Sequence, residues 1–64
     1  MTKKQIFATI KEANQIVACM EGLDTTSREY NDLNKALYWT LETLNGYKWF
    51  TLRLSKNGRY YVTF

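Results

Sequence analysis

The first third of the chain carries apolar residues at helical spacing. The residues on this apolar face are Ile6, Ile10, Ala13, Val17 and Met20. They recur every three or four positions, which is the period of an amphipathic helix. Thr2 and Gln5 have the spacing of a capping box at a helix start. Gly22 is typical of the position just past a helix end, so we predict a helix over residues 2–21.

A second stripe of the same period follows a short polar connection. Its members are Tyr30, Leu33, Leu37, Leu41 and Leu44. Thr26 and Glu29 have the spacing of a second capping box, and Gly46 marks a stop. The pattern predicts a helix over residues 27–45. Because the link between the two helices is short, we expect them to pack as an antiparallel pair.

Trp39 does not lie on the second stripe. At about 100° per residue it falls on the opposite side of the helix, beside Ala36 and Thr43. Two interpretations compete: Trp39 is buried beneath a further element, with its helix between two layers, or it is an exposed anchor for a partner. We favour the buried arrangement, because tryptophan side chains are mostly buried in folded proteins.

The last third of the chain changes to the period of a β-strand. Residues 48–54 and 59–64 are rich in aromatic and β-branched residues and alternate in polarity, as half-buried strands do. Asn57-Gly58 is typical of a two-residue hairpin turn, but that turn would leave apolar residues on both faces of the hairpin. A three-residue loop over 56–58 gathers them on one face, and we prefer it.

This loop fixes the pairing of the two strands. The expected opposed pairs are Leu54 with Tyr60, Leu52 with Val62, Phe50 with Phe64, and Ser55 with Arg59. The other face of the hairpin then carries Thr51, Arg53, Ser55, Arg59, Tyr61 and Thr63. Gly58 must adopt a left-handed conformation within a bulge. Gly58→Val should therefore destabilise the hairpin, because β-branched residues tolerate positive φ poorly.

These elements predict an α+β fold with the order α-α-β-β. The 64 residues suffice for one small domain, residues 1–64, whose core supplies only about 3–5 kcal/mol. A partner or a second copy would add to that stability. The open edges of a two-stranded hairpin suit strand addition, so a homodimer with a four-stranded sheet is one expected arrangement.

Charge is distributed unevenly along the chain. Residues 1–45 hold five basic and six acidic residues, a net charge of −1, while residues 46–64 hold four basic residues and no acid, a net charge of +4. The four basic residues are Lys48, Arg53, Lys56 and Arg59. Such a surface suits an acidic partner, whether nucleic acid or protein. The simpler interpretation is that these charges prevent edge-to-edge aggregation of the hairpin.

The sequence contains little of the chemistry that enzymes use. It has no histidine and one cysteine, Cys19, which rules out a zinc set and a Cys–His nucleophile. No glycine-rich phosphate loop is present. We expect no catalytic residues, no cofactor and no metal. A lone cysteine, the lack of a visible signal peptide and the lack of a long apolar run indicate a cytoplasmic protein that does not enter a membrane.

The first functional hypothesis is a non-enzymatic protein-binding module. The candidate partner-binding residues are Arg53, Arg59, Tyr61, Lys56, Trp39 and Trp49. In size and composition the chain resembles the small accessory proteins of bacteriophages and mobile elements. That resemblance implies an inhibitor or modulator of a larger host protein or complex.

The alternative hypothesis is nucleic-acid binding by the basic and aromatic face of the hairpin. The residues that would contact phosphates are Arg53, Arg59, Lys56 and Lys48, and Tyr61 would stack on bases. The element order resembles a helix-turn-helix with a wing, but the third helix of that motif is absent. The two hypotheses differ in their expected salt dependence, because phosphate contacts weaken steeply as salt rises.

Overall fold

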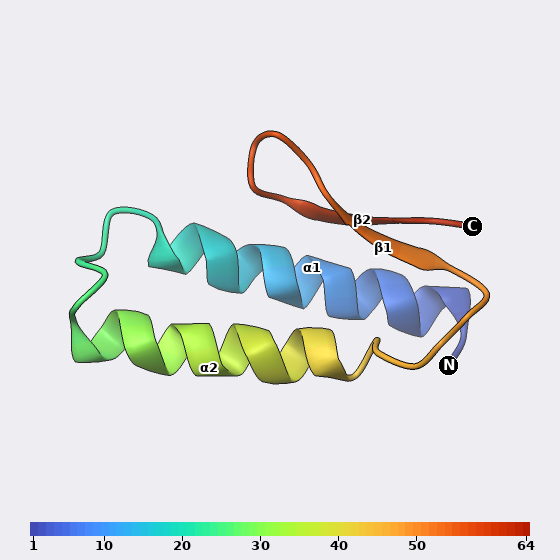
Figure 1. Cartoon of the computed structure of the whole chain (residues 1–64), viewed down its shortest axis with the longest axis horizontal. Helices are drawn as coiled ribbons and strands as arrows, with labels where there is room; N and C mark the ends of the chain where they lie inside the picture. Colours follow the sequence, from blue (N-terminus) through green and yellow to red (C-terminus); the bar gives the residue numbers. More distant parts are fainter.

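Two antiparallel helices and a β-hairpin form three layers in a computed structural model that describes residues 1–64 (Figure 1). The elements in chain order are α1 (Lys3–Met20), α2 (Arg28–Glu42), β1 (Thr51–Leu54) and β2 (Tyr60–Thr63). Helix α1 lies in the middle layer, between α2 and the hairpin. The predicted α+β fold and its element order are confirmed.

The start of α1 is capped as its sequence predicts. The Thr2 hydroxyl accepts a hydrogen bond from the Gln5 N–H at 3.2 Å, and the Gln5 side chain accepts one from the Thr2 N–H at 2.8 Å. This reciprocal pair satisfies donors that a helix N-terminus otherwise leaves unpaired. The helix ends at Met20, and Gly22 follows with a φ of +83°.

The start of α2 differs from the prediction by one residue. Ser27, not Thr26, is the N-cap, and its hydroxyl accepts from the Tyr30 N–H at 3.1 Å. Thr26 is instead held by Asp24, whose Oδ1 accepts from both the N–H and the hydroxyl of Thr26. An Asx turn of this kind takes the threonine away from the cap, so the helix begins one residue later.

Helix α2 also ends earlier than predicted, at Glu42 instead of Asn45. The next residues form a tighter turn, in which the Leu44 and Asn45 N–H groups each donate three residues back, at 3.0 Å. This turn directs Leu44 into the core, where it is 4% exposed. Its burial explains why the chain leaves the helical path before residue 45.

The hairpin has the register that the three-residue loop predicts. Leu54 pairs with Tyr60, Leu52 with Val62, and Arg53 with Tyr61. At the loop, the Gly58 N–H donates to the Ser55 carbonyl at 3.0 Å and the Ser55 N–H donates to the Arg59 carbonyl at 2.8 Å. Gly58 has a φ of +77°, the left-handed conformation that this loop requires.

The strands are shorter than predicted, because β1 begins at Thr51 and not at residue 48. Phe50 leaves the strand path and is 8% exposed in the core. The predicted pairing of Phe50 with Phe64 therefore does not form a ladder pair, although the two ring centroids are 6.3 Å apart.

The core lies between α1, the hairpin and the turn after α2. Its buried members are Ile6, Ile10, Leu44 and Phe50, and the apolar side of the hairpin packs against them with Leu52, Tyr60 and Val62. Asn14 of α1 adds a polar attachment: its side-chain amide accepts from the Tyr60 N–H at 2.7 Å and donates to the Tyr60 carbonyl at 3.0 Å.

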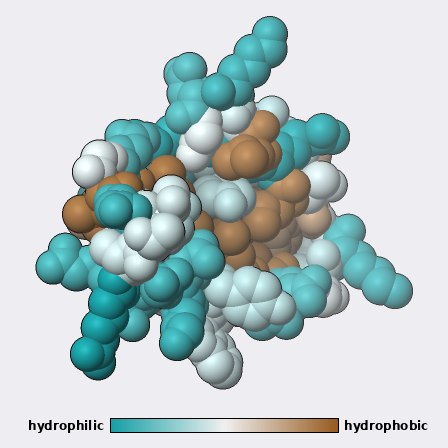
Figure 2. All heavy atoms as spheres, turned by 60° about the vertical axis from the view of Figure 1, so that its left-hand side comes forward, coloured by the Kyte–Doolittle hydropathy of each residue, from teal (hydrophilic) through white to brown (hydrophobic).

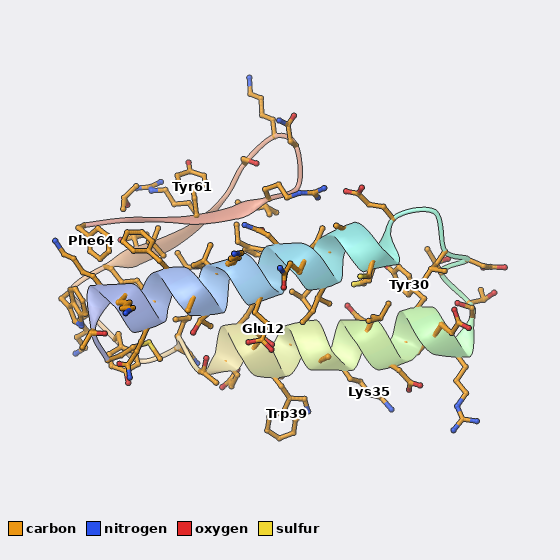
Figure 3. All side chains as sticks on the ribbon, turned by 180° about the vertical axis from the view of Figure 1, so that it is seen from behind. Glu12, Tyr30, Lys35, Trp39, Tyr61 and Phe64 are labelled. Atoms are coloured by element: carbon orange, nitrogen blue, oxygen red, sulfur yellow. The ribbon has the colours of Figure 1, made fainter.

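The expected position of Trp39 beneath the hairpin is wrong. The hairpin contacts α1 and does not contact α2, so α1 is the helix with a layer on either side. Trp39 is 72% exposed and points away from the hairpin (Figure 3). The broader apolar surface of α1, together with the hydrogen bonds from Asn14, explains why the hairpin covers that helix.

Candidate functional site

The six residues that the sequence singled out do not form one surface. Tyr61 points outward from the hairpin, while Trp39 points outward from α2 on the other side of the molecule (Figure 3). The helix layer α1 lies between them. No single partner surface of ordinary size therefore includes both residues, and the candidates must be considered by region.

The outer face of the hairpin keeps part of the predicted basic and aromatic surface. Arg53 and Tyr61 are opposed across the strands, and both are exposed. The Arg53 Nε donates to the Thr63 hydroxyl at 3.2 Å, which holds its guanidinium along the strands. Lys56 is exposed in the loop. The structure therefore brings Arg53 and Tyr61 together on the hairpin, while Lys56 lies apart from them in the loop.

Arg59 has a different environment from the other cations. Its guanidinium forms an ion pair with Glu21 at 2.6 Å, joining the start of β2 to the end of α1. The hydrogen bond that Arg59 donates and its positive charge lower the pKa of the Glu21 carboxyl, and the same hydrogen bond, accepted by Glu21, raises the pKa of Arg59. Much of the positive charge of Arg59 is therefore balanced within the chain.

Trp49 belongs to a cluster of aromatic rings near the two chain ends. It stacks on Phe64 with centroids 5.7 Å apart and meets Phe50 edge-on at 5.4 Å. Phe7 meets Phe64 edge-on at 5.8 Å, and the Lys3 Nζ lies 4.8 Å from the Phe64 ring centroid. We call this set, with Tyr47 stacked on Phe50, the aromatic cluster.

Most rings of the aromatic cluster remain exposed to solvent. Phe7, Tyr47, Trp49 and Phe64 are all exposed, and only Phe50 is buried. Sequence reasoning missed Phe7, Tyr47 and Phe64 as surface residues. The available signal was the concentration of aromatic residues after Gly46, which exceeds what one face of a short hairpin can cover.

A groove runs between the C-terminal half of α2 and β1. Its volume is about 410 Å³. Its lining residues are Tyr38, Leu41, Glu42, Leu44, Asn45, Gly46, Tyr47, Phe50, Thr51 and Leu52. Six of these are hydrophobic, and Glu42 is the only carboxylic acid among them. We call this the α2–β1 groove, and sequence reasoning did not predict it because β1 was expected to lie over α2.

A second depression lies beside Trp39. It has a volume of about 430 Å³ and is lined by Met1, Thr9, Glu12, Trp39, Thr40 and Thr43. Four of these six side chains are polar, and Trp39 and Met1 are the two hydrophobic ones. Lys35 projects from the same side of α2 (Figure 3).

Exposed apolar atoms are visible on the surface as well as in these grooves. Figure 2 shows hydrophobic atoms gathered in a central band that hydrophilic side chains surround.

No three His, Cys, Asp or Glu side chains lie close enough together to hold a metal ion. Neither helix is sufficiently long and apolar to cross a membrane.

No protein-family model, curated protein or solved structure matches the chain.

Proposed function

We propose that the protein is a small non-enzymatic module that binds a larger protein or protein complex. The observation that carries this proposal is the imbalance between buried and exposed apolar groups. Only five of the 64 residues are buried, while nine large hydrophobic side chains are exposed. Four of the nine, Phe7, Tyr47, Trp49 and Phe64, belong to the aromatic cluster, and exposed apolar patches mark interaction sites in monomeric proteins.

The total surface area supports the same conclusion. The chain exposes 4913 Å², whereas a compact monomer of 7.6 kDa exposes about 4,300 Å². The excess of roughly 600 Å² is comparable to the area that one partner contributes to a standard protein–protein interface. A radius of gyration of 12.3 Å also exceeds the value of about 10.7 Å expected for a compact chain of this length.

The proposed mode of action is occupation of a partner's surface. The chain is similar in size and composition to accessory proteins of bacteriophages and mobile elements. We therefore favour an inhibitor or modulator of a host protein as its functional class. The exposed, unpaired thiol of Cys19 suits a reducing compartment, so we propose that the protein acts in the cytoplasm.

Nucleic-acid binding remains the second candidate because Arg53 and Tyr61 are adjacent and exposed on the hairpin. The hairpin surface is less basic than its sequence indicates, since Arg59 pairs with Glu21. The remaining cations of that region, Lys48, Arg53 and Lys56, offer few phosphate contacts.

A pulldown from the native host lysate, with and without nuclease, tests the proposal. A protein partner retained after nuclease, and bound with similar affinity at low and high salt, supports it. Recovery of nucleic acid alone, with binding that weakens log-linearly as salt rises, contradicts it and supports the second candidate. Trp39→Ala and Tyr61→Ala variants should be captured unequally, because their side chains lie on opposite sides of the molecule.

A further inference from the structure

The two outer edges of the hairpin differ in their hydrogen bonding. In an antiparallel pair, residues alternate between those whose main chain faces the other strand and those whose main chain faces away. The bond from the Ser55 N–H to the Arg59 carbonyl sets this alternation. Tyr60 therefore faces outward, and Asn14 occupies both its N–H and its carbonyl. The edge of β2 is closed at this point by α1.

The edge of β1 has no such cover. By the same alternation, the main-chain groups of Leu52 and Leu54 point away from β2. The main chain of β2 lies closer to α1 than the main chain of β1 does, although the Leu52 side chain of β1 packs against the core. The side chain of Leu54, on the apolar side of the hairpin, is 59% exposed. This edge thus presents unpaired donors and acceptors beside an incompletely covered apolar side.

The α2–β1 groove adjoins this edge. Thr51 and Leu52 line it from the strand, and Tyr38 and Leu41 line it from the helix. An extended segment paired with β1 would direct alternate side chains to the two faces of the enlarged sheet. One set of side chains would point toward the helices and the groove, and the other set would lie beside Arg53 on the outer face.

Charge favours an acidic occupant over a second copy of the chain. Residues 46–64 contain no acid, and Lys48, Arg53 and Lys56 lie on or beside β1. If Leu52 paired with Leu54 of a second copy, the two Arg53 side chains would be directly opposed. If Leu52 paired with Leu52 of a second copy, Lys56 would oppose Lys48. Like charges opposed across strands destabilise the pair.

We propose that the β1 edge binds an extended segment of a partner protein in which acidic and apolar residues alternate. The segment adds a third strand beside β1, with its apolar side chains toward the α2–β1 groove and its acidic side chains beside Arg53. This inference rests on the proposed protein-binding function and names the class of partner segment.

Selection from a displayed library of random eight-residue peptides tests the proposal without the native partner. The expected result is enrichment of peptides with alternating acidic and apolar residues. The probe for further measurements is the most enriched peptide. When it binds, amide hydrogen exchange should slow at Leu52 and Leu54 and stay unchanged at Tyr60, which is already bonded to Asn14.

Matched charge reversals provide the control. Arg53→Glu should weaken binding of the selected peptide by about tenfold or more, because it places like charges together. Arg28→Glu changes the net charge equally at an exposed site on α2, and it should change binding by less than about twofold. Equal effects of the two variants would overturn the proposal, as would enrichment of basic peptides or no enrichment.

Light scattering of the protein alone measures its oligomeric state and tests whether a second copy occupies the β1 edge. A stable dimer that protects Leu52 and Leu54 from exchange would overturn the proposal in favour of a second copy. Failure of the broader function has a different signature, namely a pulldown that retains no protein after nuclease. A protein partner bound without protection at Leu52 and Leu54 would leave the broader function supported and reject the β1 edge as its site.

Discussion

Helices α1 and α2 lie side by side, but they are covered very differently. Helix α1 packs against α2 and against β2, and it buries Ile6, Ile10 and Ala13. Helix α2 packs against α1 alone, and none of its residues is buried. Both helices have amphipathic sequences of similar period. The position of each helix in the three layers decides how much of it is buried, and the amphipathic pattern of its sequence does not.

This difference in burial assigns different roles to the layers: the middle layer stabilises the fold, and the outer layers have surfaces free to bind a partner. The middle helix provides the contacts that hold the three layers together. The outer helix keeps a free side with Trp39, and the outer hairpin keeps a free edge at Leu52 and Leu54. In a chain with only five buried residues, we expect substitutions to affect either folding or binding according to the layer they alter.

Ile6→Ala should have the largest effect on stability. Ile6 is completely buried in the core cluster, so its truncation should lower the free energy of unfolding by about 2–5 kcal/mol. This loss is comparable to the whole stability of about 3–5 kcal/mol expected for a domain of this size. Urea denaturation at equilibrium measures it. Leu37→Ala, at a half-buried site on α2, should cost clearly less, and equal losses would contradict the difference between the helices.

Asn14→Ala should have the next largest effect, because it removes both side-chain hydrogen bonds from α1 to Tyr60. The expected loss is about 1–3 kcal/mol, with faster amide exchange at Tyr60 while the exchange of α2 changes less. Asn34→Ala, at an exposed position of α2, is the matched control. A loss of stability no greater than that of Asn34→Ala would show that the hairpin does not depend on this attachment.

The local features of the fold were predictable because each rests on neighbouring residues. The Thr2–Gln5 capping box and the left-handed Gly58 both follow from short sequence patterns, and both are present. The hairpin register followed from the requirement that one face be apolar. At the start of α2 the pattern predicted Thr26 as the N-cap, one residue too early, because the Thr26 hydroxyl donates to Asp24 instead.

The layer order was not predictable from the same patterns. The position of the hairpin depends on long-range contacts, including Asn14 with Tyr60 and Phe7 with Phe64, which lie far apart in the sequence. Asn14 gave little signal for this contact, because its sequence neighbours include the polar Glu12 and Gln15 and its half-buried position is a property of the folded chain. The α2–β1 groove was missed because it exists only when β1 lies away from α2.

The ion pair between Glu21 and Arg59 should give a smaller, pH-dependent contribution at the other end of α1. Arg59 lowers the pKa of Glu21 in the folded state. The pair therefore stabilises the fold above the ordinary glutamate pKa of 4.5, and this stability is lost as the pH falls through the lowered pKa. Thermal unfolding of the wild type and Glu21→Gln between neutral and acidic pH measures the effect.

Asp24 also has a lowered pKa, because of its hydrogen bonds from Thr26, so both proteins should lose stability in acid. Glu21→Gln should lose less than the wild type, and the difference should shrink at high salt because the pair is exposed. Parallel pH profiles for the two proteins would show that the ion pair contributes nothing to folding.

Trp39→Ala should have the smallest effect on stability although it removes the largest side chain of α2. The indole is mostly exposed, so we expect the free energy of unfolding to change by less than about 0.5 kcal/mol. Urea denaturation beside Ile6→Ala gives the direct comparison of the two helices. A loss above about 1 kcal/mol would mean that the outer side of α2 is packed in solution. A stable variant that no longer captures the partner would instead place the binding anchor on α2 and away from the β1 edge.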